Sequence, residues 1–182
     1  MILDLETLES LIEVNKKFAT DYFKEHGELR PMAVGYTPDN KNRIVILGGF
    51  SDDQSKAAWQ HMVSLVFLLY DVDKYVVMHE GWALLNPSDD PYRYGSLADH
   101  PDRVEVLNIV AVNRHGAKMS ISQILEDRSL KELPFGDGGE VRGSFCDLLS
   151  VLGEPRRKLT DGEKKELRKL LETMPYTTEI LH

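Results

Sequence analysis

The sequence predicts an α+β fold in which a mainly antiparallel sheet of about five strands carries N-terminal, central and C-terminal helices. Apolar residues recur at helical spacing in three separate segments, and short alternating or β-branched runs lie between them. The strands follow one another as a hairpin, then a helix and a strand, then a second hairpin. Hairpin links favour antiparallel pairing, because parallel strands need long crossover connections.

The first helix is expected from about Asp4 to His26, where apolar residues line one face and charged residues the other. Gly27 follows as its C-terminal cap. Two short strands come next, at 31–37 and 43–47. The residues between them, Pro38-Asp39-Asn40-Lys41-Asn42, are typical of turns, so the two strands are expected to form a hairpin.

A second helix is predicted from Asp52 to Tyr70. Ser51 and Gln54 have the spacing of a capping box at its start. Its later turns are apolar almost all round, which indicates a central, buried helix. The segment 74–85 is apolar on both faces and is therefore predicted to be a central strand of the sheet.

A long loop, 86–101, separates this strand from another apolar strand at 103–113. Loops of this length are often functional. The turn sequence Asn113-Arg114-His115-Gly116 then leads into an alternating strand at 117–125, whose serines are expected on a solvated face.

The last third of the chain is predicted to be helical. A glycine-rich loop at 135–140 precedes a short helix that ends near Gly153. Thr160 and Glu163 form the capping box of a final helix. We treat 1–182 as one domain, with the helical segment at about 154–182 as its candidate peripheral part.

Composition and charge narrow the classes of function. The 182 residues are 42% apolar and 29% charged, as in ordinary globular domains, and the net charge is -8. This negative charge disfavours binding to nucleic acid or to anionic membranes. The single cysteine, Cys146, allows no internal disulfide and no cysteine-based zinc site. Without a basic, apolar leader or a long apolar run, the chain is expected to be cytoplasmic.

The most suggestive feature is a set of charges within two apolar strands. Glu80 shares a strand face with Met78 and Trp82, and Arg103 and Glu105 share a face of the other strand. Charges in such surroundings are costly unless they are paired. A structural ion pair between Arg103 and a glutamate is the favoured interpretation. A binding or catalytic site, or simple exposure at the strand ends, are the alternatives.

Other candidate binding residues lie close to this set in the sequence. They are His79, Trp82, Asp99 and His100. Two histidines with carboxylates can bind a divalent metal. No recognised ligand spacing is present, however, so the sequence predicts neither a metal nor a cofactor. Cys146 has the helical spacing of a small buried residue rather than of a nucleophile.

One sequence pattern resembles a known group of proteins. Glu80-Gly81-Trp82, a proline-containing loop and Pro101-Asp102-Arg103-Val104-Glu105 are similar to a pattern in small uncharacterised bacterial and phage proteins. In those proteins a strand with Glu-Ala-Trp precedes Pro-x-Arg-x-Glu, and the similarity spans about 76–113. It implies no activity, but it implies that Glu80, Trp82, Arg103 and Glu105 act together. Gly81 departs from the usual alanine.

Three functional hypotheses follow. The first is a non-enzymatic cytosolic binding or accessory protein, with a phage genome as a candidate origin. Its partner would be another protein or a second copy of the chain in a homo-oligomer. The second is a metal-dependent or carboxylate-based hydrolase that uses Glu80 and Glu105. The third is an acidic inhibitor of a nucleic-acid-handling protein.

Overall fold

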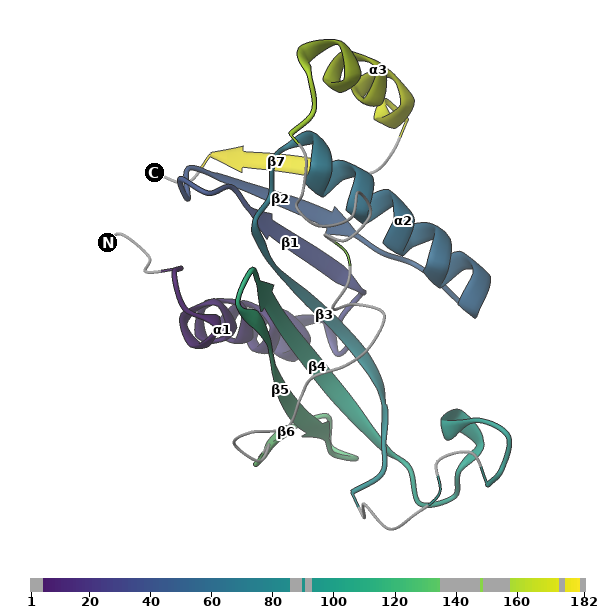
Figure 1. Cartoon of the computed structure of the whole chain (residues 1–182). Coiled ribbons are helices and arrows are strands. Elements are labelled where there is room, and N and C mark those ends of the chain that lie inside the picture. Colours follow the sequence, from purple (N-terminus) through teal and green to yellow (C-terminus); the bar gives the residue numbers. More distant parts are fainter. Residues whose placement is uncertain are drawn as a thin grey trace.

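The fold is one antiparallel sheet with helices on both faces (Figure 1). The computed structural model describes residues 5–85, 90, 93–134, 148 and 158–173, and the backbone of 176–180. Its elements are α1 (Leu8–His26), β1 (Met32–Tyr36), β2 (Asn42–Leu47), α2 (Asp53–Leu69), β3 (Lys74–Ala83), the short 3-10 helix η1 (Leu97–Asp99), β4 (Val104–Asn113), β5 (Gly116–Ile124), β6 (Leu130–Leu133), α3 (Asp161–Leu171) and β7 (Tyr176–Ile180). The predicted α+β class is confirmed.

The strand order among the described residues is β6-β5-β4-β3-β1-β2-β7. The chain from β3 to β6 is a meander of antiparallel neighbours, and β1 lies between β3 and β2. The sheet therefore has two more strands than the five expected. One of them, β7, pairs with β2, so the C-terminal segment contributes a strand to the sheet as well as a helix.

Capping side chains decide where α1 and α2 begin. The side chains of Thr7 and Ser10 each bond the other's backbone N–H, so α1 starts at Leu8 rather than at about residue 4. The cap of α2 is Asp52 with Ser55 as its partner, one residue later than the expected capping box. Both corrections move a helix start by about four residues or fewer, since several neighbouring polar side chains are able to cap.

The predicted end of α1 is confirmed at Gly27. This residue has a φ of 74°, and its N–H donates to the carbonyl of Phe23 at 2.7 Å. Glycine accepts this left-handed conformation without a Cβ clash, so the helix stops there.

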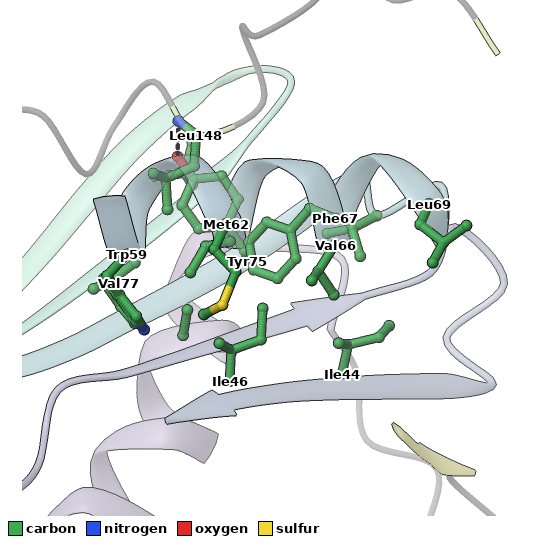
Figure 2. Close-up of a cluster of buried hydrophobic side chains, with 14 of the residues drawn as sticks. Ile44, Ile46, Trp59, Met62, Val66, Phe67, Leu69, Tyr75, Val77 and Leu148 are labelled. Carbon is green, nitrogen blue, oxygen red and sulfur yellow. Dashed lines mark hydrogen bonds between the residues drawn. The ribbon is translucent and has the colours of Figure 1, made fainter. Parts of the chain in front are cut away.

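The core has two layers, one on each face of the sheet. Between α2 and the sheet, aromatic and aliphatic side chains of α2 meet those of β2 and β3 (Figure 2). On the opposite face α1 packs on β3, β4 and β5, and side chains of β1 belong to the same cluster. Strand alternation divides β3 between the layers, with Tyr75 and Val77 towards α2 and Val76 and Met78 towards α1. The central position predicted for this strand is therefore confirmed.

The second hairpin differs from expectation in one respect. Ser122, expected on a solvated face of β5, is buried on the side of the sheet that α1 covers. The neighbouring strand β6 pairs with Ser122 through Glu132, and this additional strand was not predicted.

The final helix was predicted correctly and packs on α2. Its capping box is formed by Thr160 and Glu163. Leu171 is fully buried in the α2 layer, and Lys164 lies 2.6 Å from the Asp71 carboxylate after the end of α2. The glycine-rich loop at 135–140, Cys146 and the short helix expected to end near Gly153 lie outside the described residues. No helix in the described part of the chain is long and apolar enough to cross a bilayer.

The tight packing over β1 makes a testable prediction. A Cβ added at Gly35 would lie 2.6 Å from the Phe67 ring and 2.9 Å from a Val72 methyl, whereas one at Gly49 would meet nothing within 4 Å. We expect Gly35→Ala to lower the free energy of unfolding by about 1–3 kcal/mol through overpacking. Gly49→Ala, the matched control, should change it by less than about 1 kcal/mol. Urea denaturation measures both, and equal effects would contradict the packing described.

Candidate functional site

The candidate site lies where the sheet narrows to two strands. β1 pairs with β3 only as far as Met78, and β5 pairs with β4 only from Val106 onwards. Beyond these points β3 and β4 continue together to the pair Ala83 and Val104. Figure 1 shows η1 beyond this two-stranded extension, away from α1 and α2. In this extension the side chains of β3 and β4 are no longer covered by α1 or α2, although the two strands remain hydrogen-bonded to each other.

Two glutamates meet at the base of this extension. Glu80 and Glu105 lie on the same face of the sheet, because Glu80 pairs with Leu107 and Trp82 pairs with Glu105. The Arg128 guanidinium lies beside both carboxylates. Its Nη1 is 2.9 Å from Glu105 Oε2 and its Nη2 is 3.7 Å from Glu80 Oε2. We call Glu80, Glu105 and Arg128 the carboxylate–arginine cluster.

Arg128 also fastens the turn between β5 and β6 to the end of α1. Its Nε donates to the carbonyl of Gly27 at 3.1 Å, and its Nη2 donates to the same oxygen. The guanidinium carbon lies 4.8 Å from the centre of the Phe23 ring. A cation at a helix C-terminus is favourable, because free carbonyls leave negative charge there. Arg128 itself has a φ of 61°, a conformation that is uncommon outside glycine.

Glu80 is the more shielded of the two carboxylates. Its side chain is 23% exposed, and its Oε1 accepts a hydrogen bond from the backbone N–H of Leu29. Burial raises the pKa of Glu80, and Glu105 adds to this by its charge and by a side-chain hydrogen bond. The Leu29 N–H and Arg128 oppose the shift without cancelling it. The Glu80 carboxylate therefore binds a proton more tightly than an ordinary glutamate does.

Arg103 does not lie between the glutamates, which corrects the favoured pairing. Its guanidinium carbon lies 4.6 Å from the centre of the Trp82 ring, and its Nη1 donates to the carbonyl of His100 at 3.2 Å. Its backbone N–H closes a turn onto that same carbonyl. The turn before β4 thus directs Arg103 over the indole, whereas the turn after β5 supplies the arginine of the cluster.

His100 is the buried residue next to Arg103 in this arrangement. Its Nδ1 accepts a hydrogen bond from the N–H of Asp102 at 3.1 Å. Its ring lies perpendicular to that of Tyr94, with 4.9 Å between the ring centres. The Arg93 guanidinium lies 5.7 Å from the centre of Tyr94. These contacts connect a continuous set of aromatic and cationic side chains, namely Trp82, Arg103, His100, Tyr94 and Arg93. We call it the extension surface.

The other two sequence candidates have local contacts. Asp99 accepts a 2.6 Å hydrogen bond from Ser96 at the start of η1. His79 points to the face of β3 opposite Glu80, and its Nδ1 lies 2.8 Å from the Glu80 carbonyl. Burial lowers the pKa of His79 and so favours the neutral ring. In the described ranges no three histidine, cysteine or carboxylate side chains are grouped to hold a metal ion.

Two surface grooves open beside the cluster. One, of about 310 Å³, is lined by Glu80 together with residues before β1 and after β2. The other, of about 690 Å³, is lined by Arg103, Glu105 and the turn that follows β5. The two glutamates are therefore paired, but each remains accessible from solvent. This geometry allows contact with a ligand or partner, and it keeps both carboxylates within reach of Arg128.

Comparison with known proteins gives no assignment. No protein-family model matches the chain, and neither a curated protein nor a solved structure matches it.

The residue that sequence analysis missed is Arg128. It follows Asp127 in a turn signal, and Asp127 bonds the N–H and hydroxyl of Ser129 there. That Asx-type pattern predicts a turn. It does not show which way the arginine points, because that depends on the left-handed φ of residue 128.

The two arginines supply a matched test. We expect Arg128→Met to lower the free energy of unfolding by about 1–2 kcal/mol. The variant leaves the Gly27 carbonyl and the Glu105 carboxylate without this donor and Glu80 without its neighbouring cation, and solvent exposure moderates the loss. Arg103→Met removes an exposed stacking group and should cost less than about 1 kcal/mol. Chemical denaturation at neutral pH measures both. A larger loss for Arg103→Met would contradict the assignment of roles.

Proposed function

We propose that this chain is a non-enzymatic binding or accessory protein that recognises another protein through the extension surface. The observation that carries the proposal is the exposed Trp82 ring, 41% exposed, with Arg103 stacked on it at the end of a hydrogen-bonded ribbon. Tyr94, 46% exposed, continues the surface through its contact with His100.

The composition of the surface favours a protein partner. Tryptophan, tyrosine and arginine are the residues most enriched at interface positions that dominate binding energy. Two of them are already held here by the buried His100, because its carbonyl accepts a hydrogen bond from Arg103 and its ring contacts Tyr94. Prior ordering reduces the conformational entropy that binding must overcome. The net charge of -8 opposes nucleic acid as the ligand of these rings.

The same geometry weighs against the hydrolase hypothesis. A carboxylate binds a metal ion through its negative charge, which a guanidinium beside it offsets. Here Arg128 and the Leu29 N–H engage both glutamates. One observation keeps hydrolysis as the second candidate: Glu80 borders a groove and has a raised pKa. The inhibitor hypothesis, the cytoplasmic location and the phage origin remain predictions.

The test compares two equally exposed aromatic side chains. Trp82 belongs to the extension surface, whereas Phe18, 43% exposed, lies on α1. A partner is captured by wild-type protein from lysate of the native host, then purified and titrated by calorimetry. We expect Trp82→Ala to weaken its binding at least about tenfold. Phe18→Ala, the control, should bind as wild type does.

Three results would contradict the proposal. The first is unchanged partner affinity in Trp82→Ala. The second is an equal loss in Phe18→Ala, which would place the interface on α1. The third is saturable metal binding together with metal-dependent turnover of phosphoesters that Glu80→Gln abolishes, which would favour the hydrolase. Sedimentation analysis of the purified chain shows whether the partner is a second copy.

A further inference from the structure

The edge of β3 beyond Met78 carries backbone groups that no described strand pairs with. β1 pairs with β3 only as far as Met78, whereas β4 continues to Ala83. In the described part of the chain, 79–83 therefore has a strand on one side alone. Figure 1 shows the ribbon of β3 and β4 extending beyond α1 and α2. A strand edge of this kind is a template for pairing with another chain.

The pairing of β1 shows which backbone groups face the open side of β3. The N–H of Thr37 donates to a β2 carbonyl at 3.2 Å, so Thr37 faces β2 and Met32, five residues earlier, faces β3. Met32 pairs with Met78, which therefore turns its N–H and carbonyl towards β1. By the same alternation, Glu80 and Trp82 turn theirs to that side, where β1 no longer pairs with the strand.

We propose that a second copy of the chain pairs with this edge, β3 against β3, in an antiparallel arrangement centred on Gly81. Glu80 of each copy then lies opposite Trp82 of the other, and each of these pairs can exchange both of its backbone hydrogen bonds. The His79 Nδ1 lies 2.8 Å from the Glu80 carbonyl, which has a second lone pair for the other copy. The proposal goes beyond the proposed binding function and does not rest on it.

Gly81 suits the centre of this pairing. Two facing residues at such a position have Cα atoms about 4.5 Å apart, and glycine has no side chain to oppose its counterpart. A pairing centred on Glu80 would require Met78, which β1 already pairs with, and would place like charges opposite each other. A pairing centred on Trp82 would bring two Arg103 guanidinium groups together.

Charges across the proposed interface are complementary. The Arg103 guanidinium lies over Trp82 and therefore comes beside Glu80 of the second copy. The carboxylate–arginine cluster has one positive group, Arg128, for the two carboxylates of Glu80 and Glu105, so it attracts a further cation. The two-fold axis repeats this contact with the roles of the copies exchanged. A second copy is favoured over an unrelated strand, because it supplies an arginine at the required position.

The surroundings of the edge leave room for another chain. The groove of about 310 Å³ is lined by Glu80 together with 28–31 and 48–50. Even with an added Cβ, Gly49 in this groove would meet nothing within 4 Å. The stretch 79–83 contains neither proline nor lysine, the residues that commonly block strand edges, whereas the edge strand β6 contains Lys131.

The pairing would join the two extension surfaces. Side chains of paired strands alternate together, so the α1 sides of both copies lie on one face of the joined ribbon. Trp82 of one copy then lies diagonally across from Trp82 of the other, with Cα atoms roughly 7–8 Å apart. The dimer therefore presents two neighbouring sets of aromatic and cationic side chains.

The first test combines sedimentation with hydrogen exchange of the wild-type chain. We expect a monomer–dimer equilibrium between about 5 and 500 μM, in which the Glu80 and Trp82 amides exchange at least about fivefold more slowly at the higher concentration. The Gly81 amide, which faces β4, is the internal control and should change much less. A chain that stays monomeric at the higher concentration would overturn the inference. Exchange at Glu80 and Trp82 that does not depend on concentration would overturn it as well.

The second test locates the contact by disulfide cross-linking in a Cys146→Ser background, which removes the single native cysteine. Gly81→Cys places the two thiols on residues about 4.5 Å apart in the proposed pairing, within the range of a disulfide. Ala83→Cys, the matched control, lies on the same face, but its two copies are more than about 10 Å apart. We expect mild oxidation to cross-link Gly81→Cys at least about tenfold faster than Ala83→Cys. Equal rates would contradict the register.

The two tests protect each other. A Cβ at Gly81 would lie 3.2 Å from Asn108 Nδ2, and the wild-type measurement decides the question if Gly81→Cys fails to fold. A monomeric chain would overturn the dimer and leave the proposed recognition of a protein partner unaffected. Unchanged partner affinity in Trp82→Ala would contradict that proposed function alone.

Discussion

Burial of both faces of β3 is the constraint on which the rest of the structure depends. Val76 and Met78 pack beneath α1 while Tyr75 and Val77 pack beneath α2, so the strand must lie inside the sheet with a helix on either side. The pairing of β3 with β1 ends at Met78, and the strand continues beyond it with β4. Because alternate residues of a strand share a face, Glu80 and Trp82 lie on the α1 side of the sheet, at the point where α1 no longer covers it.

The functional features arise at this transition from buried to exposed. Glu80 is the first charged side chain on this face beyond the part that α1 covers. It is partly buried, so its charge requires partners, and it is exposed enough to border a groove. Trp82, two residues further, is exposed and has Arg103 over its ring. β3 thus places one member of the carboxylate–arginine cluster, Glu80, and one member of the extension surface, Trp82, two residues apart on the same face.

Most of the fold could be predicted because its signals are local. The left-handed cap at Gly27, the buried α2 and the alternation of β3 are all present in short stretches of sequence. The missed strands lack such signals. β6 is the four-residue run Leu-Lys-Glu-Leu at the sheet edge, and β7 is mostly polar. Pairing with a neighbour, rather than intrinsic pattern, makes these segments strands.

The sequence by itself determined that Glu80, Trp82 and Glu105 occur in apolar strands and that the glutamates need a partner, since alternation and the cost of buried charge are local properties. Only the tertiary structure decided that the partner is Arg128. The register of β3 on β4 brings the glutamates together, and a left-handed residue in a distant turn aims the guanidinium at them. Both depend on contacts between elements far apart in the chain, which no short-range pattern records.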